Sequence, residues 1–459
     1  MEYKEMWKKL LNGSRRRYST ATKTEHRNYF DEDIDRVISS SSIRRLQDKA
    51  QVYPLQENDF TRTRLTHSIE VSGIARSLGG AIGNYLLEKN DINSTQIAEL
   101  QSLLYVAGLI HDLGNPPFGH FGEEIIKGYF KRCFKEEGVK YVELNDCEKN
   151  DFINFDGNAQ TLRIITRLQY LKDEFGMNLT SGTLSALVKY PYSSDQCPNK
   201  DGEVYQKFGY FQDDKECYEW LRSETGLTEN KRNPLTYLLE AADDIAWIFS
   251  DIEDGIKKGL INWKAEYRKV KRAIKDECFL PIFKSIDDVN KIYNNIKIDN
   301  KDHYCYMQFR IRVQSKMILD VIKAFTSNYV SIMNGDFSNL VDDGKYKSLI
   351  QSSESKVMFD ELKKKLEEYC YPSQEIIFLQ LAANNILTKL LDVFVNAIIK
   401  EEDILKNVGE NIDQRALLLI SDNFMHVLGI SCRKANINPT KYQKLLLVTD
   451  FVSGMTDNY

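Results

Sequence analysis

Long proline-free intervals with apolar residues at helical spacing constrain the fold of this chain more than any other feature. The 459 residues include only nine prolines. In the segment 234–255, apolar residues recur every three or four positions, which places them on one face of a helix: Leu238, Ala242, Ile245, Phe249 and Ile252. Gly255 is expected to end this helix. We therefore predict an all-α protein.

Two further segments also carry apolar residues in a pattern that predicts a helix. Segment 64–89 carries apolar residues at strict intervals of four, and segment 99–112 (ELQSLLYVAGLIHD) is apolar on nearly all sides, as in a helix buried by its neighbours. Later in the chain, helices are expected at 317–334, 357–369, 375–400, 414–428 and 441–452.

The chain is interpreted as one large helical body, residues 1–459. Its core is expected at 35–255 and an additional C-terminal helical region at 260–459. Within the core, residues 190–226 are polar and rich in Tyr and Gly, so we expect a small irregular insertion there, with room for a short hairpin.

Composition indicates a protein of the reducing cytoplasm. The chain is 42% hydrophobic and 28% charged, with a net charge of -5, so there is no general basic field for nucleic acid or an anionic membrane. The eight cysteines form no CxxC pair, which argues against a disulfide framework and a structural zinc site. The first twenty residues lack the apolar region of a secretion signal. Segment 386–400 contains Lys389 and Asp392 and is too short to span a bilayer, so it is expected to be a buried or amphipathic helix.

The stretch GLIHDLGNPPFGHFGE (108–123) places charge where an apolar helix ends. An ionised Asp112 in apolar surroundings needs a partner, and a cation near the helix end could contact both His111 and Asp112. Asp243 flanks the apolar stripe of its own helix, and His67 lies at the start of another. Two imidazoles and two carboxylates suit Mn²⁺, Mg²⁺, Fe²⁺ or Zn²⁺ with positions left for water.

Each of these residues also has an ordinary explanation. A single His on an apolar helix is more often a hydrogen-bonded core residue, and Asp244 could replace Asp243 as the inward-facing acid. The clustering of histidines favours a functional site, since three of the six histidines (His67, His111 and His120) lie in these two segments.

Together these segments resemble a known family. TRLTHSIEV, HDLGNPPFGHFGE and EAADDIAW are similar to the H…HD…D signature of the HD-domain metal-dependent phosphohydrolases, and the middle motif resembles deoxyguanosine triphosphate triphosphohydrolases (dGTPases). The blocks NFDGNAQTLRI, LVKYP and DFVSGMTDNY extend the resemblance from about Asp35 to the C-terminus. The fold that it implies is a helical HD-domain metallo-phosphohydrolase core.

The resemblance also implies roles for individual residues. The metal ligands would be His67, His111, Asp112 and Asp243. The catalytic side of the site would hold the pair His120 and Glu123, together with Asn115 and Asn158. The phosphates would contact Arg64, Lys189 and Tyr190, and the deoxyribose would contact Gln51, Trp247 and Asp251. Members of the family usually have Tyr in place of Trp247, which puts the sugar contact in question.

The activity implied is metal-dependent hydrolysis of dGTP to deoxyguanosine and inorganic triphosphate, with a metal-activated water attacking the α-phosphate. A broader dNTP triphosphohydrolase, or a nucleoside monophosphate phosphatase on the same fold, is the nearest alternative. The basic runs SRRR and SIRRLQDK leave open a nucleic-acid-binding protein with a regulatory metal site, although such runs are more often solvated. The resemblance further implies a homo-oligomer, a hexamer, and single-stranded DNA as an effector.

Overall fold

Helices make up nearly all of the regular structure in the computed structural model. The structure describes residues 2–459 except 18–26, 57, 59, 137–140, 142, 170–172, 197–198, 201–202, 205–206, 229, 295–300, 338–346, 401–410 and 436–437. Within these residues, the named strands form one small antiparallel hairpin, β1 (Asn199–Lys200) and β2 (Glu203–Val204). The prediction of an all-α protein is confirmed.

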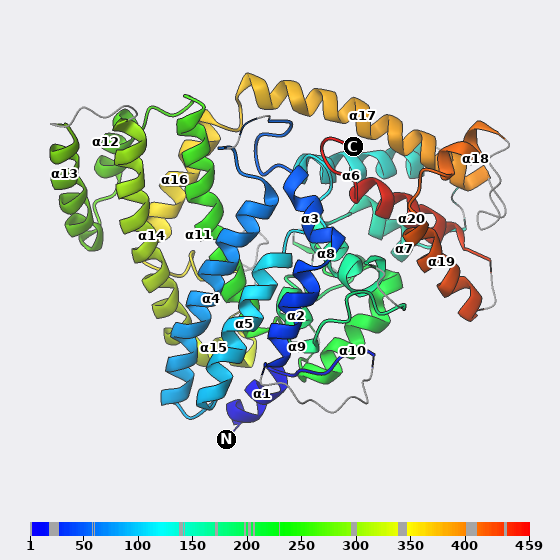
Figure 1. Ribbon diagram of the computed structural model, residues 1–459, viewed down its shortest axis with the longest axis horizontal. Coiled ribbons are helices and arrows are strands. Elements are labelled where there is room, and N and C mark those ends of the chain that lie inside the picture. The colour runs from blue at the N-terminus through cyan, green and yellow to red at the C-terminus, as the bar shows by residue number, and fades with distance from the viewer. Residues whose placement is uncertain are drawn as a thin grey trace.

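Three long helices form the centre of the molecule. They are α4 (Arg64–Glu88), α5 (Ser94–Ile110) and α11 (Pro234–Lys257), with α4 packed against both of the others (Figure 1). The apolar row predicted on α4 is fully buried, as Leu78 and Ile82 show. Burial of this apolar row against α5 supplies the hydrophobic stabilisation that holds α4 and α5 together.

Capping residues set where these helices begin. The side chains of Thr63, Asn93 and Asn233 each accept a hydrogen bond from a backbone N–H in the first turn of α4, α5 and α11 respectively. The boundaries expected for α4 are close to those observed, but α5 begins at Ser94, ahead of the expected segment 99–112, and α11 continues past Gly255 to Lys257. Gly255 is buried against Cys370 and Ile261, so its small size serves packing and not helix termination.

Gly108 allows α4 and α5 to approach closely near the C-terminal end of α5. A Cβ atom on Gly108 would lie 2.6 Å from the Cα of Ser72 on α4. Any side chain at this position would push the two helices apart, and His111 follows Gly108 by one helical turn. The close crossing therefore brings the end of α5 up to α4.

Shorter helices surround this centre. Helices α2 and α9 pack beside α5, α1 packs on α9, and a second hydrophobic cluster forms where α6 and α7 meet the C-terminal helices. Their bounds are α1 (Glu2–Leu10), α2 (Tyr29–Ile38), α3 (Ser41–Arg45), α6 (Gly119–Glu136), α7 (Asp146–Ile153), α8 (Gly157–Arg163) and α9 (Ser181–Leu187). A 3-10 turn follows α3 at Leu46–Asp48, and a π-helical turn follows α8 at Ile164–Leu168.

The insertion at 190–226 is more helical than expected. Its middle contains the predicted hairpin, β1 and β2, but its end forms a 3-10 turn (Gln212–Asp214) and helix α10 (Lys215–Thr225). Buried Cys217, Tyr218 and Leu221 anchor α10 to the molecule. The expectation of an irregular segment is therefore wrong for its last part, because spacings of three and four among these residues already allowed a helix.

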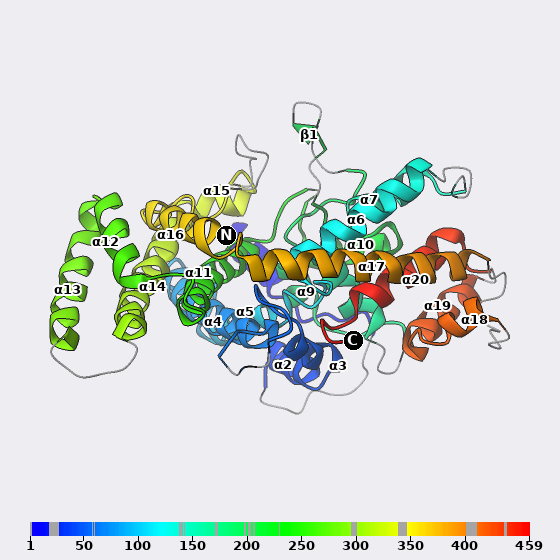
Figure 2. The ribbon, with the colours of Figure 1, turned by 90° about the horizontal axis from the view of Figure 1, so that it is seen from above.

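The C-terminal helices lie on both sides of the centre. Figures 1 and 2 show α12 to α14 at one end of the molecule and α18 to α20 at the other, with α17 running from the middle of the molecule to α18. Their bounds are α12 (Trp263–Ala273), α13 (Leu280–Asn294), α14 (Lys301–Ser327), α15 (Tyr329–Asn334), α16 (Lys356–Tyr369), α17 (Gln374–Lys400), α18 (Ile412–Leu417), α19 (Asp422–Ala435) and α20 (Lys441–Ser453), with a 3-10 turn at Glu277–Phe279. The division into a core (35–255) and a C-terminal region (260–459) stays a prediction.

Two of the expected C-terminal helices are each divided in the structure. The segment 317–334 is covered by α14, which begins at Lys301, and by the separate short helix α15. The segment 414–428 is split by residues 418–421 into α18 and α19. Apolar spacing continued across both breaks, so the sequence pattern did not show them.

Helix α17 is long and apolar enough to cross a bilayer, judged by length and composition alone. Segment 386–400 was expected to be too short to span a bilayer. The structure corrects this expectation of length, because the helix that contains the segment already begins at Gln374. Its inner face packs on α6, α18 and α20 through buried residues such as Leu387 and Leu391, while Phe378 on the outer face is 71% exposed. The amphipathic pattern agrees with the expectation, and one such helix is weak evidence for a membrane span.

Candidate active site

A cavity of about 590 Å³ lies where α4, α5 and α11 meet the start of α17. This volume falls within the range of binding sites for small molecules and cofactors. Most residues that the sequence assigned to the site line it. They are Gln51, Arg64, His67, His111, Asp112, Asn115, His120, Asn158, Lys189, Asp243, Trp247 and Asp251.

The cavity contains a three-residue cluster with the geometry of a metal site. His67 on α4, His111 at the end of α5 and Asp243 on α11 each offer a ligand atom, and these atoms all lie within 4.8 Å of one another. The Nε2 atoms of His67 and His111 are 3.1 and 3.6 Å from Oδ1 of Asp243. Each donor comes from a different central helix, so the packing of those helices assembles the cluster.

The environment of His111 favours a cation. Its Nδ1 lies 2.8 Å from the carbonyl oxygen of Gly108, so Nδ1 donates to that oxygen and Nε2 faces the cluster. Within the described residues, this Nε2 is buried and makes no hydrogen bond. Burial lowers the pKa of His111, but Asp112 and Asp243 outweigh it and raise the pKa to about 9. The same carboxylates would attract a divalent ion, so the donor set fits one.

Asp112 lies beside this cluster. Its Oδ1 is 3.5 Å from Nε2 of His111 and accepts a hydrogen bond from Asn115 at 2.7 Å. Its Oδ2 accepts from Arg64 at 2.6 Å and from Gln51 at 3.3 Å. Burial would raise the pKa of Asp112, but His111 and Arg64 hold it well below its usual range. The carboxylate is therefore ionised, and its role as a fourth ligand stays a prediction.

A His–Glu pair stands at the start of α6. Nδ1 of His120 lies 3.0 Å from Oε2 of Glu123, whose Oε1 accepts the backbone N–H of Gly157 at 2.8 Å. Burial would raise the pKa of Glu123, but its hydrogen bond with His120 lowers it. The His120 side chain is 81% exposed and lines the cavity. A fixed carboxylate orients the imidazole and leaves its other nitrogen available for proton transfer.

Two lysines mark one end of the cavity. Lys189 pairs with Glu240 on α11 at 3.2 Å, and Lys207 lines the cavity nearby. The ring of Tyr190 lies under both ammonium groups, at 5.9 Å from Lys189 and 5.8 Å from Lys207. Tyr190 itself is buried and does not line the cavity, so the structure places it behind the lysines.

An aromatic ring and a buried acid lie further along α11. The indole nitrogen of Trp247 donates to Asp244 at 3.2 Å, and its ring packs edge-on against Phe359 at 5.5 Å. Asp251 is buried, and burial together with the nearby Asp254 raises its pKa well above the usual range. Asn158 lines the cavity, and its amide donates to Asp156 at 2.7 Å.

Comparisons with known proteins agree with this geometry. Residues 64–169 match the HD domain family. The chain is 38% identical to a deoxyguanosinetriphosphate triphosphohydrolase-like protein of Listeria monocytogenes, over 99% of this chain and 97% of that protein. The chain belongs to the deoxyguanosinetriphosphate triphosphohydrolase family. A relative with the same "-like" name from Synechocystis is 30% identical over 98% of the chain, and the deoxyguanosinetriphosphate triphosphohydrolase of an Enterobacter species is 28% identical over 98%. As an HD-domain protein of this dGTPase family, the chain is a metal-dependent phosphohydrolase.

In this member of the dGTPase family, several residues that line the cavity were not predicted from the sequence. Lys207 comes from the insertion, where no periodicity pointed to a function. The C-terminal helices supply four more, with Lys363 on α16, Tyr371 after it, and Ile376 and Gln380 on α17. The sequence motifs did not predict that residues of α16 and α17 line the cavity, because only long-range packing brings these helices to it.

Gly157 provides a test of the geometry of the candidate active site. A Cβ atom at this position would lie 2.4 Å from Oδ1 of Asn115 and 2.7 Å from Oε1 of Glu123. Both atoms end flexible side chains, so we expect Gly157→Ala to fold but to displace the His120–Glu123 pair. The turnover number should fall about ten- to a hundredfold.

Steady-state kinetics and thermal unfolding measure the two effects of Gly157→Ala separately. Gly128→Ala on α6 is the matched control, because a Cβ there meets nothing within 4 Å. Normal turnover by a folded Gly157→Ala variant would show that the placement of Asn115 and Glu123 does not limit the reaction.

Proposed function

We propose that the protein hydrolyses dGTP to deoxyguanosine and inorganic triphosphate. The observation that supports this most is the position of the cluster of His67, His111 and Asp243. It lies in one cavity that is cationic at Lys189 and Lys207 and carries Trp247 further along its wall. A deoxynucleoside triphosphate combines a polyanion with an apolar sugar face, and so matches this arrangement.

In this proposal, helix α11 would set the direction of the bound nucleotide. Glu240, which pairs with Lys189, and Asp251 are eleven residues apart, or roughly 16 Å along the helix axis. Asp243 lies between them, one turn from Glu240. The triphosphate would therefore extend from the cluster toward Lys189, and the nucleoside toward Asp251.

The residues of the chain have distinct parts in this proposal. A bound divalent ion would polarise the α-phosphate and lower the pKa of water. Arg64, Lys189 and Lys207 would neutralise charge on the phosphate oxygens. His120 would donate a proton to the departing 5′-oxygen of the nucleoside, while Glu123 holds its ring in place.

We expect the unmodified protein to hydrolyse dGTP much faster than GTP. Asp243, Trp247 and Asp251 are spaced by fours and line the cavity as a row on α11. In the proposal, the Trp247 ring packs against the C2′ side of the sugar and leaves no room for a 2′-hydroxyl, while Gln51 and Asp251 bind the 3′-hydroxyl. A misplaced hydroxyl costs roughly 1–3 kcal/mol, or about five- to more than a hundredfold in rate.

Trp247→Ala should reduce this discrimination more than it slows dGTP hydrolysis. Trp247→Tyr, which introduces the residue usual in the family, should keep the discrimination. Rates on dGTP and GTP, with circular dichroism of each variant, provide the measurement. Equal rates on both nucleotides in the unmodified protein, or an unfolded Trp247→Ala variant, would leave Trp247 as a packing residue next to Phe359.

The activity itself is tested by product analysis. Purified protein is incubated with each dNTP in Mn²⁺, Mg²⁺, Fe²⁺ or Zn²⁺, and triphosphate is separated from pyrophosphate and phosphate. Deoxyguanosine with triphosphate supports the proposal. Similar rates on all dNTPs would favour the broader triphosphohydrolase, and release of single phosphates would contradict attack at the α-phosphate.

The basic run SRRR gives little support to the nucleic-acid alternative. Arg15 pairs with Asp33, Arg16 with Glu216, and Arg17 with Asp173. These arginines are therefore used within the molecule. A hexamer and a single-stranded DNA effector remain parts of the proposal that come from the family resemblance, and mass measurement with and without DNA tests them. A cytoplasmic location remains a part that comes from the composition, because the eight cysteines form no CxxC pair.

A further inference from the structure

The carboxylate of Asp457, near the C-terminus, joins two segments that flank the candidate active site. Its Oδ2 accepts the backbone N–H of Ala50 at 2.7 Å, and its Oδ1 accepts the backbone N–H of Phe118 at 2.9 Å. Ala50 precedes Gln51, whose amide contacts Asp112, and Phe118 lies two residues before His120. One side chain thus connects two segments that supply residues to the lining of the cavity.

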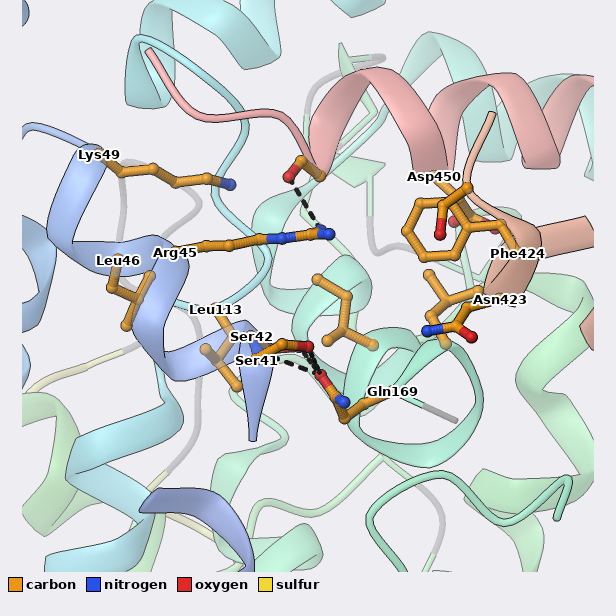
Figure 3. A pocket seen from close by; sticks show the side chains of 14 residues that line it. Ser41, Ser42, Arg45, Leu46, Lys49, Leu113, Gln169, Asn423, Phe424 and Asp450 are labelled. Atoms are coloured by element: carbon orange, nitrogen blue, oxygen red, sulfur yellow. Dashed lines mark hydrogen bonds between the residues drawn. The ribbon is translucent and has the colours of Figure 1, made fainter. Parts of the chain in front are cut away.

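Neighbouring contacts hold the C-terminal segment in the same place. The buried ammonium of Lys49 donates to the carbonyl oxygens of Asn115 at 2.5 Å and Ser453 at 3.0 Å. Arg45 donates to the carbonyl oxygen of Gly454 at 3.3 Å, and Figure 3 shows Arg45 and Lys49 extending in the same direction. Main-chain atoms of the C-terminal segment are therefore fixed against the loop after α5.

The backbone at Phe118 requires support. Phe118 has a φ of +62°, a left-handed conformation that is unfavourable for a residue with a side chain. Gly119 follows with a φ of +59°, and a Cβ there would meet Arg64 at 2.4 Å. A charged acceptor on the N–H of Phe118 stabilises this conformation. The turn directs the start of α6, and with it His120, toward the cavity.

We propose that Asp457 is a positioning residue that fixes the Gln51 and His120 segments relative to each other for the hydrolysis proposed above. The proposal rests on that function for its kinetic consequence, but its structural part does not depend on it. Each carboxylate oxygen serves a different segment. An amide at this position retains one acceptor oxygen, so it can support only one of the two N–H groups.

The test compares Asp457→Asn and Asp457→Ala with Asp48→Asn. Asp48 is the matched control, because its side chain is exposed and its backbone carbonyl oxygen accepts the N–H of Asp457 at 3.1 Å. We expect the turnover number with dGTP to fall about ten- to a hundredfold in Asp457→Asn and at least as far in Asp457→Ala, with a smaller change in KM. Metal content, measured on purified protein, should stay unchanged.

Amide hydrogen exchange of peptides that cover 49–51 and 113–119 supplies a readout that is independent of turnover. Exchange should rise in both Asp457 variants and not in Asp48→Asn. Unchanged exchange would overturn the proposal whatever the kinetics. A loss of thermal stability with normal turnover per folded molecule would reduce Asp457 to a structural role. Faster exchange in a protein without dNTP hydrolysis would leave the connection standing and contradict the proposed function.

Discussion

Asp243→Asn should remove the bound metal ion and nearly all turnover while leaving the fold intact. Asp243 is the residue of the cluster whose Oδ1 approaches both His67 and His111. Asparagine has the same shape, so the packing of α11 should survive, but it carries no charge to hold a divalent ion. The change also lowers the density of negative charge beside Asp112 and Asp244.

Metal analysis and thermal unfolding test this prediction together. An ion that binds only the folded state raises its stability with concentration, so added Mn²⁺ should raise the Tm of the unmodified protein and not that of Asp243→Asn. Asp244→Asn is the matched variant. Asp244 accepts from Trp247, and burial together with Glu240 raises its pKa to about 7, so we expect this variant to keep the ion. Loss of metal in Asp244→Asn with normal metal in Asp243→Asn would exchange their roles.

His120→Ala should keep the metal ion and lose most of the rate. Its ring nitrogen is bonded to Glu123, outside the cluster of His67, His111 and Asp243, so ligation should not change. A group that transfers a proton in the transition state typically contributes about 10² to 10⁴ in rate. The turnover number should fall by that factor while the metal content stays constant.

The exposure of His120 allows a sharper control. Its side chain is 81% exposed, so free imidazole can reach the space left by His120→Ala and should restore part of the rate. Glu123→Gln, which removes the charge behind the ring, should lower the rate less than His120→Ala and should not respond to imidazole. If His120→Ala loses the metal, then His120 is a ligand and the proton-transfer role is wrong.

Local sequence patterns determined most of the helices and the position of the motifs. The apolar row of α4 and the stripe of α11 predicted those helices within a few residues, because burial of one helix face repeats every three to four positions. The concentration of His67, His111 and His120 in two short segments indicated a site. The motifs themselves supplied the family.

The partners of these residues were decided only by the tertiary structure. Asp243 is far from His67 in the chain, and the resemblance, not the periodicity, separated it from Asp244. Lys207 lies in a segment without helical periodicity, and the sequence did not show that it lines the cavity. Breaks such as the one between α18 and α19 were also invisible, since apolar spacing runs through them.

The cavity residues on α16 and α17 and the contacts of Asp457 show most clearly what the sequence pattern could not predict. Lys363 and Gln380 reach the cavity, and Asp457 reaches Phe118, across hundreds of residues of chain. Amphipathic spacing specifies which face of a helix is buried, but not which distant segment buries it. The sequence by itself therefore determined the helices and the chemistry available at their ends. Long-range packing alone decided which of those ends meet in one cavity.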